Sequence, residues 1–216
     1  MTMEKLITDI QAQQRNRNRV NIYLDGNYAF SLDRMAAAWL TVGRKLSDED
    51  ITRLQAKDEF ETALVRAMHF LSFRARSEQE MKTYLNKKGF EPALIEQVIT
   101  RLKEDKLVDD LDFAQNWLDN RQRFRPRSKW LMKLELRQKG VAEHKIEQAV
   151  QLTDLDDFDL ALDAGRKIGR RYHHLDKPEH DRKLGAALQR RGFSYEVIRE
   201  CLPVLWKERS EPSGAK

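Results

Sequence analysis

A pattern that occurs three times at nearly constant spacing constrains this fold more than any other feature of the sequence. The copies read RSEQEMKTYLNKKGFEPALIEQVITRL from Arg76, RSKWLMKLELRQKGVAEHKIEQAVQLT from Arg127 and HDRKLGAALQRRGFSYEVIRECLPVL from His180. Gly89, Gly140 and Gly192 are each followed by an apolar residue, and equivalent positions lie 51 or 52 residues apart. Such a period indicates stacked like units, which offer an extended surface and usually no buried catalytic pocket. We therefore expect a protein that binds something long.

Composition excludes several classes of protein. Charged residues make up 35% of the chain and hydrophobic residues 40%, which is typical of a charge-rich, helix-prone, soluble protein. No apolar run approaches the roughly 18 residues of a membrane span, and the start MTMEKLITDIQ lacks a signal pattern. The single cysteine, Cys201, excludes an internal disulfide. We expect a monomeric, cytoplasmic protein with no membrane contact.

The first 57 residues differ from the rest because polar and apolar residues alternate there. Residues near 4–13, 19–24 and 27–32 are predicted strands, and Asp25-Gly26 is a strong hairpin signal between two of them. A short helix is expected after Asp33, and another from Ser47, with Asp50 as a weak variant of the capping box. We expect a small β-hairpin module with little core of its own.

Apolar residues recur at helical spacing from Asp58 onward. Glycines 89 and 140 suit the left-handed position after a helix, and Pro92 suits a first helical turn. The predicted helices are 58–74, 77–88 and 91–104; 110–124, 128–139 and 143–153; and 156–172, 179–191 and 194–208. The expected segments are an N-terminal module (1–57), three repeats (58–108, 109–154 and 155–209) and a disordered tail (210–216). The fold is thus predicted to be mainly α, an elongated array of tandem three-helix units after a small β module.

Three stretches carry a resemblance to a known family. They are ALVRAMHFLSFRARSEQEMKTYLNKKGF (63–90), LVDDLDFAQNWLDNR (107–121) and VNIYLDGNYAFSL (20–32). With these stretches the chain resembles the RecX family of regulators of the RecA recombinase, including that family's Asp-Asp step before Phe-Ala, here Asp109, Asp110, Phe113 and Ala114. The chain departs from the family at residues 120–130, where Pro126 and an arginine cluster stand in place of a plainer polar linker.

The resemblance implies a binding protein and not an enzyme, with no cofactor. RecX-like proteins bind the RecA filament on single-stranded DNA along its helical groove, and block filament growth, ATP hydrolysis and strand exchange. Some also bind DNA directly. The implied partners of this chain are therefore a RecA-type recombinase filament and single-stranded, possibly double-stranded, DNA.

Basic residues are the candidate binding residues, and they fall into three groups. The first group is Arg121, Arg123, Arg125, Arg127, Lys129, Lys133, Arg137 and Lys139, set against the single acid Glu135. The second is Arg74, Arg76, Lys82, Lys87 and Lys88; the third is Arg166, Lys167, Arg170 and Arg171, followed later by Arg190 and Arg191. Such groups neutralise phosphates or pair with carboxylates of a protein partner, and Phe124 or Trp130 is placed to stack on a base. The alternative is a solvated basic helix face.

Other candidate sites have simpler interpretations. Asp109, Asp110 and Asp112 resemble a carboxylate metal cluster, but acids at a helix start usually cap it. His173, His174 and His180 are interpreted as solvated loop histidines, and Cys201 as a buried apolar residue. We predict no catalytic and no metal-binding residue. The main alternative function is a basic helical DNA-binding module without a recombinase partner; a nuclease using the Asp109–Asp112 cluster is the second.

Overall fold

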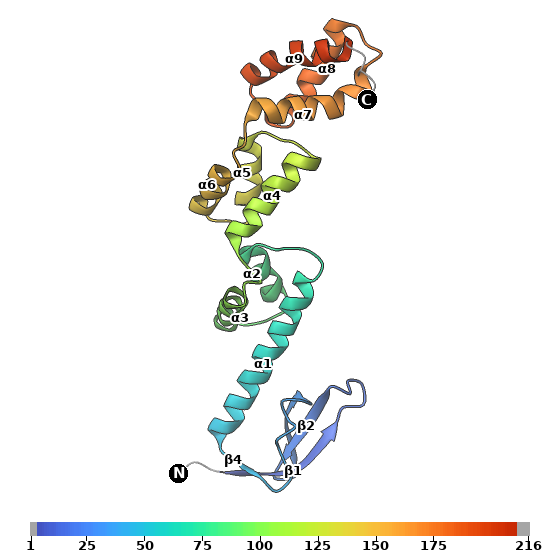
Figure 1. The fold of residues 1–216 in the computed structure, drawn as a ribbon. Helices are drawn as coiled ribbons and strands as arrows, with labels where there is room; N and C mark the ends of the chain where they lie inside the picture. Colours follow the sequence, from blue (N-terminus) through green and yellow to red (C-terminus); the bar gives the residue numbers. More distant parts are fainter. Residues whose placement is uncertain (1–3, 211–216) are drawn as a thin grey trace, which may run out of the picture. The chain divides into compact units, whose positions relative to one another are not determined.

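The N-terminal strands form one antiparallel sheet in the computed structural model, which describes residues 4–210 (Figure 1). Strands β1 (Lys5–Ala12), β2 (Arg19–Leu24), β3 (Asn27–Asp33) and β4 (Lys45–Leu46) lie in the order β3-β2-β1-β4. Asp25 and Gly26, both with positive φ, close the hairpin between β2 and β3. This confirms the three expected strands and the hairpin signal.

One face of the sheet is buried under helix α1 (Asp48–Leu71). Ile7, Ile22 and Leu32 have no exposed surface, and Leu54 of α1 packs in the same cluster. Fully burying such a side chain contributes about 1.5–3 kcal/mol. The module therefore has a substantial core, contrary to expectation, because the first half of α1 completes it.

The helices of this region differ from the prediction in two places. Residues 34–39 form hydrogen-bonded turns instead of a short helix. The expected helix from Ser47 and the expected helix over 58–74 are one continuous helix of 24 residues, which begins with a full Ser47–Asp50 capping box. No glycine or proline stands between Asp48 and Leu71, so nothing interrupts the backbone hydrogen bonds at Asp58.

The chain divides into two compact units. The first contains Met1–Arg74 and Tyr84–Arg101, and the second contains Ala75–Thr83 and Leu102–Lys216. The boundary therefore passes through helices α2 (Glu78–Lys87) and α3 (Pro92–Glu104). Within the first unit, the ring of Phe70 stacks on Tyr84 with centroids 4.0 Å apart.

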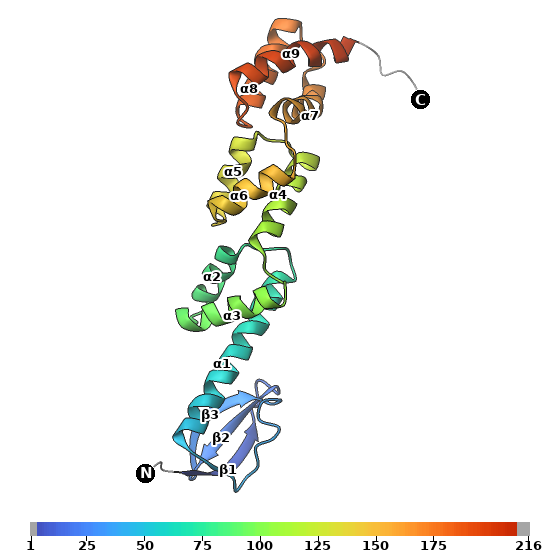
Figure 2. The same ribbon diagram turned by 60° about the vertical axis from the view of Figure 1, so that its left-hand side comes forward.

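The second unit holds the remaining helices (Figure 2). They are α4 (Asp110–Phe124), α5 (Lys129–Gln138), α6 (Glu143–Leu152), α7 (Asp157–Gly169), the short 3-10 helix η1 (Arg170–Tyr172), α8 (Lys177–Gln189) and α9 (Tyr195–Ser210). One continuous apolar cluster joins them, with Met132, Ile146 and Leu184 among its fully buried members. Among residues 4–210, no helix is both long and apolar enough to cross a membrane.

These elements confirm a mainly α fold with tandem three-helix units after a small β module. Gly89, Gly140 and Gly192 have φ values of +85°, +77° and +85°, as expected after a helix end. The elongated array and the domain boundaries stay predictions. Of the expected tail, Ser210 ends α9, and residues 211–216 lie outside the described part of the chain.

Two joints of the same design link successive repeats within the second unit. In joint 1, the Ser77 hydroxyl donates to the carbonyl of Lys139 (2.6 Å), and the N–H of Glu78 donates to the carboxylate of Asp110 (2.8 Å). The start of α2 is thus capped in part by Asp110 of the following repeat. The bond satisfies the N–H of Glu78, one of the groups that a helix end leaves without intrahelical partners.

Joint 2 repeats this arrangement one unit further along. The N–H of Ser128 donates to the carbonyl of Arg191 (3.0 Å), and the N–H of Lys129 donates to the carboxylate of Asp157 (2.7 Å). Here the start of α5 is capped by the first residue of α7 and by the loop between α8 and α9. Equivalent positions therefore meet in both joints, although the serine donates through its hydroxyl in joint 1 and through its backbone N–H in joint 2.

The glycine in each joint permits a close approach of the chain. A Cβ atom on Gly140 would lie 2.3 Å from the Cβ of Gln79, and one on Gly192 would lie 2.5 Å from the Ser128 hydroxyl. No real Cβ tolerates such distances. These glycines are thus required by packing as well as by their positive φ.

Candidate functional site

Most of the basic stretch from Arg121 to Lys139 is neutralised within the second unit. The ion pairs are Arg121–Glu135 (2.7 Å), Arg127–Glu135, Lys133–Glu147 (2.7 Å), Arg137–Glu143 (2.6 Å) and Lys139–Glu80 (3.0 Å). Arg121 and Lys139 also lie over the ring of Trp117, whose indole N–H donates to Glu135. These cations are therefore engaged inside the chain, and their role in binding a partner stays a prediction.

Three members of the same group have no such partner. Among residues 4–210, no carboxylate lies within ion-pair distance of Arg123, Arg125 or Lys129. Next to them in the chain, Phe124 is 69% exposed and Trp130 is 61% exposed. Cations interleaved with exposed aromatic rings are typical of surfaces that bind single-stranded nucleic acid.

The third repeat brings further cations to this place. Lys167, near the end of α7, donates to the backbone carbonyl of Arg123 at the end of α4. At joint 2 the Arg191 backbone contacts Ser128, which immediately follows Arg127. Two basic groups that are separate in the sequence thus meet. We call Arg123, Arg125, Arg127, Lys167, Arg171, Arg190 and Arg191 the joint-2 basic cluster.

The lowered pKa of Arg191 indicates that its surroundings disfavour its positive charge. Burial lowers the pKa of the Arg191 guanidinium, and the positive charges of Arg127, Arg190 and Arg171 lower it further. Each cause disfavours the charged form that an arginine keeps at neutral pH. An anion bound here would relieve the repulsion, and a phosphate or a carboxylate fits the guanidinium fork.

Comparison of the two joints explains why Arg191 has no ion-pair partner among the described residues. Lys139 in joint 1 and Arg191 in joint 2 hold equivalent positions, each directly before the joint glycine. Lys139 pairs with Glu80, but Leu131 occupies the position equivalent to Glu80 in the second repeat. The replacement of Glu80 by Leu131 is visible when the repeats are aligned. Only the joint geometry shows that this position faces the residue before the glycine of the next repeat.

The second predicted group is divided between the two units. Arg74, Lys87 and Lys88 belong to the first unit, and Arg76 and Lys82 belong to the second. Lys88 lies over the Tyr84 ring (5.5 Å), and Lys82 pairs with Glu78 (3.0 Å). The role of this group in binding a partner stays a prediction.

Part of the third group is also engaged. Arg166 forms a two-pronged ion pair with Glu208 (2.7 and 3.0 Å) and contacts Asp163 (3.2 Å). The hydrogen bonds to Glu208 raise the pKa of Arg166, so this arginine fixes α7 to α9. Arg170 and Arg171, in η1, are exposed.

The other candidate sites resolve into structural roles. Asp109 caps α4 by accepting from the N–H of Leu111 (2.8 Å), as expected for an acid at a helix start. Asp110 also acts as a cap, but for α2 in joint 1. No group of His, Cys, Asp or Glu within residues 4–210 is arranged to hold a metal ion.

The histidines differ from one another. His173 and His174 are exposed, but the interpretation as a solvated loop residue is wrong for His180. This residue lies in α8 and is 2% exposed, with its ring against Trp206 (5.1 Å) and its Nδ1 3.0 Å from Asp181. The predicted helix over 179–191 already contained His180, and in α8 (Lys177–Gln189) this residue lies on the buried face with Leu184, Ala187 and Leu188.

Family models match consecutive segments that span most of the chain. They are described as the regulatory protein RecX N-terminal domain (residues 5–47) and the first (63–102), second (109–150) and third (155–202) three-helix domains of RecX. The regulatory protein RecX of Bacillus pumilus is 34% identical over 208 residues, which cover 95% of this chain and 79% of that protein. The chain belongs to the RecX family.

Further RecX proteins support this assignment. Regulatory protein RecX of Bacillus subtilis is 33% identical, with the same coverage of both chains. A crystal structure of regulatory protein RecX is similar, with a TM-score of 0.66 and 26% identity, over 91% of this chain and 98% of that one. The crystal structure of RecX from Lactobacillus salivarius shares the fold, with a TM-score of 0.59 and 22% identity, over 70% of this chain and 99% of that one.

Proposed function

We propose that this protein inhibits a RecA-type recombinase by binding its filament on single-stranded DNA. Bound along the filament, it blocks filament extension, ATP hydrolysis and strand exchange, and it does so as a cytoplasmic monomer and without catalysis of its own. The observation that carries this proposal is the match of all four RecX domains in their order along the chain.

The joint-2 basic cluster supplies a physical basis for this activity. Its cations, with Arg123 and Arg125 unpaired in the described chain, meet the DNA backbone or acidic side chains of the filament. Several weak contacts from one chain add through effective concentration, so that binding to successive protomers is stronger than any single contact.

The test is single-stranded-DNA-dependent ATP hydrolysis by the cognate recombinase while this protein is titrated. We expect inhibition well below one molecule per protomer, because a few bound molecules stop the growth of a filament. The assay is repeated with a fivefold excess of DNA over the saturating amount. No inhibition at any ratio would contradict the proposal.

A stand-alone DNA-binding module is the second candidate function. It is favoured by the exposed rings of Phe124 and Trp130 beside unpaired arginines, since bases stack on such rings. In this case inhibition would appear only near saturation of the DNA and would be relieved by the extra DNA. The same titration therefore separates the two candidates.

A further inference from the structure

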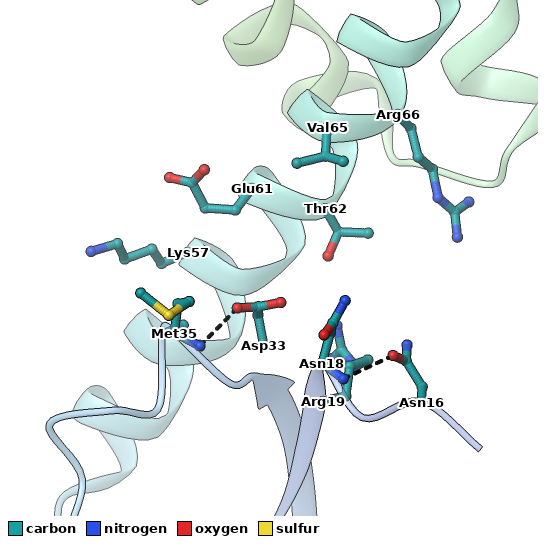
Figure 3. A pocket seen from close by; sticks show the side chains of 11 residues that line it. Asn16, Asn18, Arg19, Asp33, Met35, Lys57, Glu61, Thr62, Val65 and Arg66 are labelled. Atoms are coloured by element: carbon teal, nitrogen blue, oxygen red, sulfur yellow. Dashed lines mark hydrogen bonds between the residues drawn. The ribbon is translucent and has the colours of Figure 1, made fainter. Parts of the chain in front are cut away.

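The first unit carries a groove that the proposed function does not use. It has a volume of about 660 Å³ and lies between the middle of α1 and the end of β3 (Figure 3). Thr62, Val65 and Arg66 form one wall, and Asn18 and Met35 belong to the other. In Figure 3, Thr62 and Arg66 point from α1 toward the ends of the strands. The volume suits a peptide side chain with its neighbours.

A buried carboxylate fixes the two walls to each other. Asp58 of α1 accepts from the N–H of Asp33 (2.6 Å) and from the guanidinium of Arg19 (2.8 Å), and its side chain is only 8% exposed. The carboxylate of Asp33 in turn accepts from the N–H of Met35 (2.8 Å). The groove is therefore preformed, and a ligand binding in it need not order the walls.

Large apolar side chains at the groove are unusually exposed. Met35 is 81% exposed and Val65 is 64% exposed, and Met68, one turn further along α1, is 50% exposed. Neighbouring exposed apolar residues mark protein interaction sites, and methionine adapts to the shape of its partner. The groove is thus suited to an apolar side chain of another protein.

Positively charged residues flank the apolar side chains of the groove. Lys57 and Arg66 line the groove, while Arg17 and Arg34 stand between lining residues in the sequence. None of these four has an ion-pair partner in the part of the chain that the structure describes. Arg19 is paired with Asp58, and the carboxylates of Asp33 and Glu61 also line the groove, so the four cations exceed the acids around it. The rim therefore favours a negatively charged partner.

We propose that this groove docks an acidic protein segment that carries one large apolar side chain. The apolar side chain packs between Met35 and Val65, and the flanking carboxylates meet Lys57 and Arg66. The inference rests on the proposed function, because the segment belongs to a recombinase protomer. The groove thereby provides a contact with the protein component of the filament, separate from the basic cluster at joint 2.

The experiment measures binding of the full chain to the cognate recombinase in the absence of DNA. Val65→Lys is expected to weaken binding about tenfold, the loss of one buried apolar side chain. Val42→Lys is the matched control, because Val42 is 60% exposed and does not line the groove. Lys57→Glu is expected to weaken binding severalfold, and Glu61→Lys, which adds positive charge one turn away, is expected to strengthen it.

Each outcome bears on a different part of the inference. Equal loss from Val65→Lys and Val42→Lys, or no loss from either, would overturn the groove as the docking site. Weaker binding of Glu61→Lys would overturn the acidic character of the segment. If the unchanged protein neither binds nor inhibits the recombinase, the proposed function itself is wrong. Binding to single-stranded DNA, measured in parallel, is expected to be the same for all four variants and the unchanged protein.

Discussion

Cys201 is the residue whose chemistry is most clearly determined by its surroundings. Its side chain is fully buried, and the thiol lies 3.6 Å from the carbonyl of Phe158. Burial, followed by the negative charges of Glu200, Asp156 and Asp159, raises the pKa of Cys201 to about 11. At pH 8 roughly one thiol in a thousand is then ionised, and the thiolate is the reactive form.

We predict that Cys201 is labelled very slowly by a thiol reagent at pH 8. The expected rate is at least about a hundredfold below that of the same protein in urea, because both burial and the raised pKa suppress the thiolate. Both rates are measured from the absorbance of the anion that the reagent releases when it reacts with the thiol. Rapid labelling of the folded protein would mean that the packing around α9 opens readily.

Single residues also show which parts of the site could be read from the sequence. The caps at Ser47 and Asp109 depend on neighbours within three residues, so their prediction succeeded. The pairing of Lys139 with Glu80 depends on residues 59 positions apart. A count of bases and acids within residues 121–139 leaves Glu80 out. Such a count therefore overestimates the positive charge that stays unpaired in this stretch.

At the scale of the structural elements, the joints between repeats restrict which residue can stand at their glycine positions. Gly89 and Gly192 share a φ of +85°, but only Gly192 is also in close contact with another repeat. Around Gly89 nothing lies within 4 Å of an added Cβ. Comparing substitutions at the two glycines therefore distinguishes the cost of backbone strain from the cost of disturbed packing.

We predict that Gly192→Ala destabilises the protein more than Gly89→Ala. Gly89→Ala should cost about 1–2 kcal/mol, the strain of an L-residue in the left-handed region. Gly192→Ala adds the displacement of Ser128 and Leu131, about 1–3 kcal/mol more. Urea unfolding followed by circular dichroism measures both free energies of unfolding. Equal losses would show that the joint yields without cost.

The elements themselves were largely predictable, and the exceptions have a physical cause. Helices α2 to α9 follow from apolar spacing, capping residues and left-handed glycines, all of which are local. The continuity of α1 was missed because its two halves serve different partners: Leu54 packs on the sheet, whereas Phe70 stacks on Tyr84. The apolar pattern changes along the helix, although the backbone does not.

At the scale of the whole molecule, the net charge is +5, and folding determines which of the cations are paired with acids. Internal ion pairs neutralise most of the basic stretch after Arg121, and joint 2 collects cations from two repeats. The repeat pattern and the family resemblance were sufficient to predict the fold class. They did not identify this cluster, because its members converge only through contacts between repeats.

We predict that Arg190→Ala with Arg191→Ala lowers the salt dependence of binding to single-stranded DNA. Each phosphate contact contributes about 0.7 to the log–log slope of affinity against salt, so losing two contacts should lower the slope by about 1.4. The control is Lys133→Ala with Arg137→Ala, which removes the same charge from cations paired with Glu147 and Glu143 and should change the slope less. Fluorescence anisotropy over a series of salt concentrations measures both.

The stability of the same variant shows whether these arginines serve binding or the fold. Because burial, and after it the neighbouring positive charges, lower the pKa of Arg191, its charge opposes folding. The Arg190→Ala, Arg191→Ala variant should therefore be at least as stable as the unchanged protein in urea, while the ion-paired control loses stability. This combination, a weaker polyanion contact with no loss of stability, is expected only if the cluster is maintained for a partner. A marked loss of stability, or equal changes of slope in the two variants, would instead give Arg190 and Arg191 a structural role at joint 2.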